Sequence, residues 1–325
     1  ELIVELIYEL AKFGYQTRPD TEITIEINPA TLTEKKLDTY LKAGINRFSV
    51  GAQSFSDRLL KLVHREHNAK QTIETLELLR KYNLNFSFDL LFALPTQSID
   101  ELRHDIAVAI DLGSKHISPY CLTVPEGHPL SKNRPPDEDQ LEMFDMIHTE
   151  LQKKSFSRYE ISNYSLSGYE SKHNLLYWTD QEYWGLGLSA HSYSKMTPWG
   201  SRFWNLNSFD LYTKQIESQG VLVDLNDLSL PAQAQQIEIL DPHQSLTDFC
   251  YTSLRLSSGL SVDKLVQKFG NTTSGLIKNV VDPLLKGNLL KEVDKHYMLT
   301  DAGITISNQI FEKFTFLKTD LDQKM

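Results

Sequence analysis

Polar groups that could bind a charged ligand recur at every second position in the stretch that follows Gly44. These groups are the guanidinium of Arg47, the hydroxyl of Ser49 and the amide of Gln53, and Gly51 falls on the same face. The positions between them are apolar: Phe48, Val50 and Ala52. This period of two predicts a β-strand with one polar face. Because a strand packed between helices is normally apolar on both faces, and because the basic cluster of residues 64–67 follows at once, we predict that the polar face borders a cavity for a polar ligand.

The same alternation recurs in three further segments, residues 22–27, 85–90 and 116–120. Helical patterns separate the segments, which predicts successive βα units of a (β/α) barrel. Ligands of such barrels bind at the C-terminal ends of the strands, where Glu26, Gln53 and Asp89 lie. An ordinary amphipathic sheet with one wet face is the alternative, which we rank second because parallel strands joined by helices are rarely wet on one side.

Composition excludes several classes of protein. The formal net charge of -10 and the lack of a basic face argue against a nucleic-acid partner. The only cysteines, Cys121 and Cys250, are too few for a disulfide scaffold, and we expect both to be buried as small apolar residues. No apolar run of eighteen residues and no signal peptide occur in the sequence. We therefore predict a cytoplasmic protein with no membrane-spanning segment.

The order of patterns along the chain predicts three domains. Residues 1–122 carry the βα units of the partial barrel core, and residues 123–209 form an extension dense in aromatic and polar groups. Residues 210–325 read as helices near 246–256, 262–269 and 275–286, a strand pair within 289–299 and a final helix after Thr300. The predicted fold class is α/β, an incomplete barrel lacking its first units, joined to a C-terminal winged-helix-like α+β domain.

Several motifs resemble the oxygen-independent coproporphyrinogen III oxidase family of radical S-adenosylmethionine (SAM) proteins. They are Glu-Ile-Asn-Pro at 26–29, Gly-Ile-Asn-Arg-Phe-Ser-Val-Gly-Ala-Gln-Ser-Phe at 44–55, His-Arg-Glu-His at 64–67 and Phe-Asp-Leu-Leu-Phe-Ala-Leu-Pro at 88–95. Two others, Tyr-Glu-Ile-Ser-Asn at 159–163 and His-Asn-Leu-Leu-Tyr-Trp at 173–178, are similar to the heme chaperone branch of that family rather than to its true oxidases. The resemblance covers nearly all 325 residues and extends to the family's C-terminal domain.

The resemblance implies roles for four residues in binding SAM. Arg65 would contact the SAM carboxylate, since a guanidinium fork matches a carboxylate. Gln53 and Asp89 would hydrogen-bond the ribose hydroxyls, and Glu26 would take the SAM amino group or a ribose hydroxyl. The structural alternatives are an interior salt bridge of Glu26 and Asp89 with Arg47, and for Arg65 a surface charge on a helix.

The resemblance also implies heme binding by His173, Tyr177 and Trp178. Imidazole is a common axial ligand of heme iron, and aromatic rings suit the face of a macrocycle. On composition alone, His173 would be a hydrogen-bonded packing residue, so both roles stay open, and His191 is a second candidate ligand. We expect His64 and His67 to be structural neighbours rather than ligands.

One family feature is missing from the sequence. The family begins with a strand and a loop whose three closely spaced cysteines hold a [4Fe–4S] cluster, and this chain has no such motif. No residue of the chain is therefore predicted to ligate the cluster, which we expect only in a complete protein. The pattern starts in mid-helix without a capping residue, so we expect an N-terminal truncation.

The resulting prediction is a radical SAM-family heme chaperone that delivers heme to respiratory heme proteins. An enzyme that decarboxylates coproporphyrinogen III oxidatively in porphyrin biosynthesis is the alternative, disfavoured because of the motif at 173–178. A cofactor-less interaction protein is the third. The sequence assigns no catalytic residue, and it leaves open whether the chain forms a homodimer.

Overall fold

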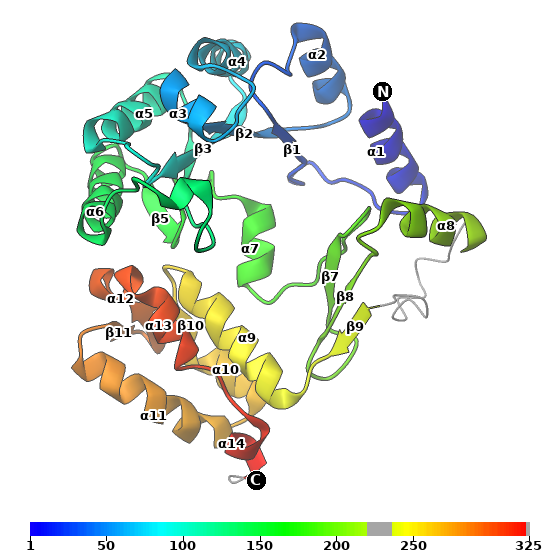
Figure 1. Cartoon of the computed structure of the whole chain (residues 1–325). Helices are drawn as coiled ribbons and strands as arrows, with labels where there is room; N and C mark the ends of the chain where they lie inside the picture. Colours follow the sequence, from blue (N-terminus) through cyan, green and yellow to red (C-terminus); the bar gives the residue numbers. More distant parts are fainter. Residues whose placement is uncertain (220–235, 323–325) are drawn as a thin grey trace. The chain divides into compact units, whose positions relative to one another are not determined.

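The alternating stretch after Gly44 forms β2 (Arg47–Gln53), an inner strand of a six-stranded sheet (Figure 1). The computed structural model describes residues 1–219 and 236–322. Contacts divide the chain into two compact units, Glu1–Ser171 and Lys172–Met325, called unit 1 and unit 2 below. The domain boundaries at 122 and 209 stay predictions.

The sheet of unit 1 is mixed. Its strand order is β1-β2-β3-β4-β6-β5, and its other strands are β1 (Thr24–Ile27), β3 (Asn85–Phe92), β4 (His116–Cys121), β5 (Ser157–Glu160) and β6 (Asn163–Ser165). The pairs β1–β2, β2–β3 and β3–β4 are parallel, while β4–β6 and β5–β6 are antiparallel. Within the described residues the sheet is open, with β1 and β5 at its edges. The predicted α/β fold with successive parallel βα units is thus confirmed.

Helices form the outer layer around this curved sheet (Figure 1). They are α1 (Leu2–Lys12), α2 (Glu34–Lys42), α3 (Asp57–Leu62), α4 (Ala69–Lys81), α5 (Ile99–Asp111) and α6 (Asp137–Lys153). Capping boxes at Asn68 and Ser98 start α4 and α5 by satisfying free backbone N–H groups. The apolar face of the sheet meets these helices, so Phe48, Val50 and Phe88 are fully buried. Each such side chain contributes about 1.5–3 kcal/mol to the stability of unit 1.

Unit 2 begins with α7 (Lys172–Trp178) and an antiparallel sheet of β7 (His191–Ser194), β8 (Ser201–Trp204) and β9 (Gln236–Ile239). The helix α8 (Phe209–Gln219) follows β8 along the chain. The sequence patterns predict neither α7 nor this sheet. Aromatic residues are so frequent in this segment that neither the helical period of 3.6 residues nor the strand period of two can be recognised. The secondary structure of this segment therefore depends on tertiary contacts within unit 2 rather than on a local sequence pattern.

The C-terminal part of unit 2 has the predicted winged-helix-like composition. Its elements are α9 (Pro242–Arg255), α10 (Val262–Phe269), α11 (Thr272–Lys286), α12 (Asp301–Thr305), α13 (Ser307–Glu312) and α14 (Lys318–Asp322), with a sheet of β10 (Leu260–Ser261), β12 (His296–Leu299) and β11 (Leu290–Val293). Asp294 and Lys295 join β11 to β12 with φ of 47° and 60°, the left-handed pair of a tight hairpin turn. Thr300 caps α12 by accepting the Gly303 N–H, and a Cβ at Gly303 would collide with the Leu289 carbonyl.

Two expectations about cysteines and membranes can be compared with the structure. Cys250 is buried, as expected, but Cys121 is exposed, so the prediction for Cys121 is wrong. Cys121 is the last residue of β4, where the inward-facing part of the strand ends, and its Sγ lies 3.7 Å from Gln140 Oε1 and 3.9 Å from Arg134 Nη2. Within residues 1–219 and 236–322, no helix combines the length and apolarity needed to cross a bilayer.

Candidate functional site

The polar faces of the unit 1 strands form one continuous surface. Parallel register aligns Ser49 with Ser87, Ser87 with His116, and Asp89 with Ser118. Arg47, at the start of this surface, is 4% exposed, and Ser87 and His116 are also buried. The polar face is therefore buried at Arg47, Ser87 and His116, half-buried at Ser49 and Asp89, and exposed at Glu26.

Asp89 is the central acidic group of this surface. Ser49 Oγ donates to Asp89 Oδ2 at 3.4 Å, and Ser87 Oγ donates to Ser49 Oγ at 3.0 Å. The pKa of Asp89 is raised to about 6, chiefly by burial and also by the nearby Glu26 charge, while hydrogen bonds from Ser118 and Ser49 oppose the shift. Asp89 is therefore a carboxyl group whose charge a bound hydroxyl or cation would stabilise.

Arg47 acts on Asp89 only through its charge, which lowers the pKa of Asp89. The Nε of Arg47 is buried and has no hydrogen-bond partner in the described part of the chain. Among the described residues, Arg47 makes no hydrogen bond to Asp89. The Asp89 carboxylate can therefore accept a further hydrogen bond from a ligand.

Gln53, Asn28 and Arg65 gather where β1 and β2 end. Gln53 is 7% exposed, and it adopts a φ of 68°, a left-handed conformation that turns the chain out of the strand. A Cβ at Gly51 would lie 3.5 Å from Gln53 Nε2 and 3.6 Å from Asn28 Oδ1, so both side chains border this glycine. Arg65 Nη1 donates to Asn28 Oδ1 at 3.5 Å. These groups lie at the strand ends, as the barrel pattern predicts.

Glu26 and Arg65 differ in their surroundings. Glu26 is exposed on β1, two residues before Asn28. Arg65 lies in the connection between α3 and α4 rather than on a helix, and it is half-buried. The nearby His67 is buried with Nε2 3.2 Å from the Ala52 carbonyl, and burial lowers its pKa, which fits a packing role.

In unit 2, α7 brings His173 and Tyr177 together. The Tyr177 hydroxyl lies 3.0 Å from His173 Nε2, and the two rings meet edge to face with centroids 5.0 Å apart. This contact follows from the spacing of four residues on a helix. The Tyr177 ring also lies against the ring of Tyr183, at 4.5 Å. Tyr177 therefore connects the exposed imidazole to a larger aromatic group.

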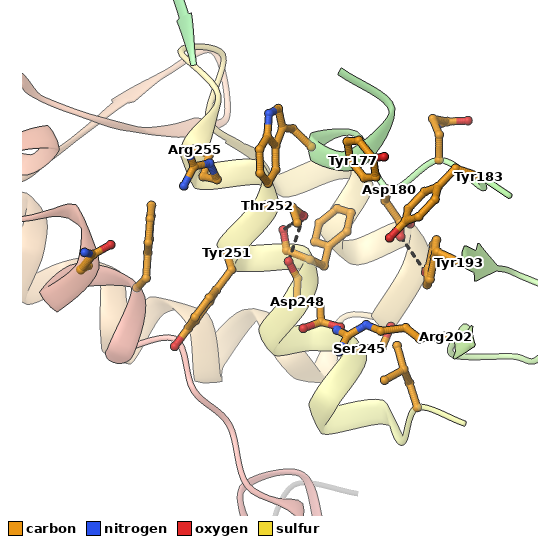
Figure 2. Close-up of a pocket in the computed structure, with 16 residues that line it drawn as sticks. Tyr177, Asp180, Tyr183, Tyr193, Arg202, Ser245, Asp248, Tyr251, Thr252 and Arg255 are labelled. Carbon is orange, nitrogen blue, oxygen red and sulfur yellow. Dashed lines mark hydrogen bonds and ion pairs between the residues drawn. The ribbon is translucent and has the colours of Figure 1, made fainter. Parts of the chain in front are cut away.

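That aromatic group lines a cavity of about 560 Å³ within unit 2 (Figure 2). Its lining comes from segments far apart in the sequence: Tyr177, Trp178, Asp180, Gln181, Tyr183, Tyr193, Arg202, Leu240, Ser245, Asp248, Phe249, Tyr251, Thr252, Arg255, Asn308 and Phe311. Figure 2 shows Tyr177, Tyr183 and Tyr193 on one side of α9 and Tyr251 on the other. We call this cavity the aromatic pocket. Its size is within the range of small-molecule sites.

Charged groups of the aromatic pocket are mostly paired with one another. Arg202 forms ion pairs with Glu238, at 3.2 Å, and with Asp248. Asp180 accepts from the Tyr193 hydroxyl and from Lys268 Nζ, each at 2.8 Å. Burial raises the pKa of the Tyr193 phenol, and the charge of Asp180 adds to the shift.

Arg255 lies at the other end of the pocket. Its guanidinium carbon is 4.4 Å from the centre of the Trp178 ring, the geometry of a cation–π contact. The Nε1 of Trp178 is buried and has no hydrogen-bond partner among the described residues. This end of the pocket thus combines an aromatic surface with two kinds of donor.

Sequence reasoning missed the α9 side of the pocket. Ser245, Asp248, Thr252 and Arg255 are spaced by three or four residues, so one face of α9 carries all of them. That spacing was a signal that could have been found. The other candidate, His191, stacks on Trp204 with centroids 5.5 Å apart and is not part of the pocket lining.

The described residues offer no ready-made metal site. Among residues 1–219 and 236–322, no group of three His, Cys, Asp or Glu side chains lies close enough to hold an ion. The two cysteines stand in different units, so the residues present do not fit a [4Fe–4S] cluster, and no step of the proposal below involves one.

Comparison with known proteins identifies the relatives of the chain. Residues 1–109 match the family model of the radical SAM superfamily. The chain is 32% identical over 302 residues to heme chaperone HemW of Bacillus subtilis (strain 168), which covers 90% of this chain and 76% of the relative. Heme chaperone HemW of Haemophilus influenzae is 30% identical over 319 residues, which is 97% of this chain and 79% of the relative.

A solved structure supports the same fold. The Escherichia coli structure described as "Coproporphyrinogen III oxidase (HemN) from Escherichia coli is a Radical SAM enzyme" superposes with a TM-score of 0.77 at 19% identity. The match covers 96% of this chain and 74% of that chain. These findings confirm the resemblance of the sequence motifs, and the chain belongs to the HemW family of radical SAM proteins.

Proposed function

We propose that this chain is a cytoplasmic heme chaperone that binds heme through unit 2 and passes it to respiratory heme proteins. One observation carries the proposal: α7 holds His173 in contact with Tyr177, which lines an aromatic pocket in a chain 32% identical to a heme chaperone. An imidazole supplies an iron ligand, and a group of rings supplies a surface for a flat macrocycle.

His173 is the proposed ligand of the heme iron. Its side chain is exposed on α7, where a bulky ligand can reach it. Iron binds through the lone pair of a ring nitrogen, and at Nε2 it would replace the contact to the Tyr177 hydroxyl. Heme uptake would therefore exchange one interaction of Nε2 for another, which favours a reversible rather than a permanent site.

Tyr177 and Trp178 are proposed to face the macrocycle. They are neighbours at the end of α7, and both line the aromatic pocket. Their rings lie 6.4 Å apart at 58°, so they offer two differently oriented surfaces. A conjugated ring gains from offset or edge contacts of this kind.

We also propose that unit 1 binds SAM at the C-terminal ends of β1, β2 and β3. Asp89 and Gln53 would hold the ribose hydroxyls, Glu26 the amino group, and Arg65 the carboxylate. The donor set fits SAM because Asp89 is a buried acceptor whose raised pKa a hydrogen-bonding ligand would relieve. In radical SAM proteins the chemistry is supplied by SAM itself. The side chains named here would only bind and orient it.

The test is a titration of the whole chain with hemin, followed by the absorbance of the Soret band, beside a titration with coproporphyrin. The proposal expects saturable hemin binding with a defined Soret shift and little response to coproporphyrin. Saturable binding of coproporphyrin without a hemin response would contradict it and favour the decarboxylase. Absence of any response would contradict heme binding by this chain.

A further inference from the structure

A second cleft of unit 2, with a volume of about 410 Å³, borders the aromatic pocket. It is lined by the connection after α7, the hairpin of β7 and β8, and the helices α9 and α10. Three lysines contribute to this lining, Lys195, Lys264 and Lys268, and none of them lines the aromatic pocket. We call it the lysine cleft. We propose that it binds a small phosphate ester with an aromatic body, a ligand that neither the heme proposal nor the SAM proposal involves.

The lysine cleft carries more positive than negative charge. Asp180 is the one carboxylate among the described residues that line it. Asp180 Oδ2 accepts from Lys268 Nζ at 2.8 Å and lies 3.3 Å from Lys195 Nζ, while its Oδ1 accepts from the Tyr193 hydroxyl at 2.8 Å. In the part of the chain that the structure describes, no carboxylate pairs with the ammonium group of Lys264. Three lysines against one aspartate leave an excess of two positive charges, in a chain whose formal net charge is -10.

The position of Lys264 is unfavourable for the helix that carries it. Lys264 belongs to the first turn of α10, where the helix dipole disfavours a positive charge. Lys268 follows four residues later on the same face, and like charges at this spacing repel each other. The stability of α10 therefore does not explain the two lysines. An anion in the cleft would be attracted by both ammonium groups and by the dipole.

The donors of the lysine cleft favour a phosphate over a carboxylate. An ammonium group is a compact charge that can donate to a tetrahedral anion from any side, whereas a planar carboxylate is matched best by the fork of an arginine. An excess of two positive charges also matches a phosphate monoester, whose charge near pH 7 is about -1.5 to -2. Thr197 adds an independent observation, because it lines the cleft and its Oγ1 is buried with no hydrogen-bond partner among residues 1–219 and 236–322. Rotation about χ1 would let this hydroxyl donate to a phosphate oxygen.

Aromatic rings beside the lysines indicate the body of the ligand. Tyr193, Trp199 and Phe249 line the cleft. The Trp199 ring is stacked on Phe269, with centroids 5.8 Å apart and planes at 8°, which fixes the indole in place. Lys268 Nζ lies 5.5 Å from the centre of the Phe249 ring, so charge and aromatic surface adjoin each other. The volume of about 410 Å³ falls in the range of small-molecule sites and is larger than a phosphate group alone requires.

The experiment is a calorimetric titration of the whole chain with phenyl phosphate, beside benzoate, which pairs a ring with a carboxylate, and inorganic phosphate, which has no ring. Wild type should bind phenyl phosphate about tenfold or more tightly than either of the others. Lys264→Gln should weaken phenyl phosphate binding about tenfold, the effect of one charge-assisted hydrogen bond, whereas Lys264→Arg should keep most of it because it keeps the charge. Lys295→Gln removes an exposed lysine of unit 2 that pairs with Asp263, and as the matched control it should bind like wild type.

Thermal unfolding of each variant is measured first, and Lys264→Gln should unfold at the same or a higher temperature than wild type, because it removes a like-charge pair. Absence of saturable phenyl phosphate binding, or unchanged binding in Lys264→Gln, would overturn the proposal. Benzoate bound as tightly as phenyl phosphate would overturn the preference for phosphate, and inorganic phosphate bound as tightly would overturn the aromatic body. These titrations contain neither hemin nor SAM, so their outcome is independent of the proposed function.

Discussion

The two candidate sites are constructed in opposite ways. In unit 1, the polar groups stand on adjacent parallel strands, and the register of β2, β3 and β4 alone brings them into one row. In unit 2, the pocket lining comes from α7, β7, β8, α9 and α13, whose positions in the sequence are far apart. The first site follows from the alternation of residues along neighbouring strands, whereas the second forms only when distant elements pack together.

This difference has a chemical counterpart. Unit 1 buries titratable groups, and burial raises the pKa values of Asp89 on β3 and Asp105 on α5 to about 6 each. The raised pKa values in the unit 2 pocket belong to the phenols of Tyr183 and Tyr193, which stay neutral at ordinary pH. The charge of the carboxyl groups in unit 1 therefore depends on pH near neutrality. The pocket of unit 2 instead presents a neutral aromatic surface. Four predictions test whether the two sites are this distinct.

The largest effect is expected from His173→Ala in unit 2. Loss of the imidazole should weaken hemin binding by about 100-fold and remove the iron-dependent Soret shift, since metal sites lose affinity steeply when a supporting group is removed. Titrations with hemin and with iron-free protoporphyrin measure this, and only the former should change. His191→Ala is the control and should behave as wild type. An unaltered hemin spectrum in His173→Ala would exclude His173 as the ligand.

A smaller effect is expected from Asp89→Asn in unit 1. The variant should bind SAM about tenfold more weakly, because a charge-assisted hydrogen bond to ribose is lost. Its free energy of unfolding near pH 7 should be about 1–3 kcal/mol higher than that of wild type, because the variant no longer has to bury an ionised carboxylate. Equilibrium dialysis with SAM and urea unfolding measure the two effects.

The matched control for Asp89 is Asp105→Asn. Asp105 is equally a buried carboxyl with a pKa raised to about 6, but it accepts from Ser54 Oγ at 2.7 Å and from the Phe55 N–H at 2.8 Å. SAM affinity should therefore stay unchanged in this variant. Equal loss of SAM binding in both variants would show that burial of charge, rather than contact with SAM, is responsible.

The third prediction concerns pH. A carboxyl whose pKa is higher in the folded state binds more protons when folded, so its contribution is fully present below its unfolded pKa near 4 and is lost as pH rises to about 6. His116 opposes this, since burial lowers its pKa to about 3 and its contribution to stability rises with pH. The informative quantity is therefore the difference between wild type and the Asp89→Asn, Asp105→Asn double variant.

That difference should grow by about 2–6 kcal/mol between pH 4 and pH 7, since two carboxyls contribute, with the double variant gaining relative to wild type. Urea unfolding of both proteins at several pH values measures it. Hemin binding by unit 2 should not follow the same pH curve. If hemin affinity followed the same pH curve as the difference in free energy of unfolding between wild type and the double variant, the two sites would be coupled.

The smallest effect is expected from Tyr177→Phe. The variant keeps the ring against Tyr183 but removes the hydroxyl that contacts His173 Nε2 at 3.0 Å. Hemin affinity should rise about twofold to tenfold, the value of one ordinary hydrogen bond that no longer competes with iron. Soret titration of Tyr177→Phe beside Tyr183→Phe measures it. A fall in affinity would show that the hydroxyl supports the ligand instead.

The sequence predicted unit 1 well and unit 2 unevenly, for identifiable reasons. Alternation is a local signal, and the observed β2 and β3 contain the alternating residues predicted to form strands. The helices α4 and α5 follow β2 and β3, as the predicted βα order requires. The α7 segment was recognised by its motif, but its helix was not, because aromatic residues occur in strands and helices alike. Cys121 was misplaced because nothing local distinguishes the last buried residue of a strand from the first exposed one.

By itself, the sequence determined the family, the βα order of unit 1 and which side of each strand is polar, because these depend on residue types and on their period. Only the tertiary structure decided that Arg47, Ser87 and His116 are buried, that Tyr177 contacts His173, and that Arg255 lies over Trp178. The last of these joins two residues that lie far apart in the sequence, on α7 and α9. A contact of that kind depends on how helices pack, and no local pattern of residues encodes it.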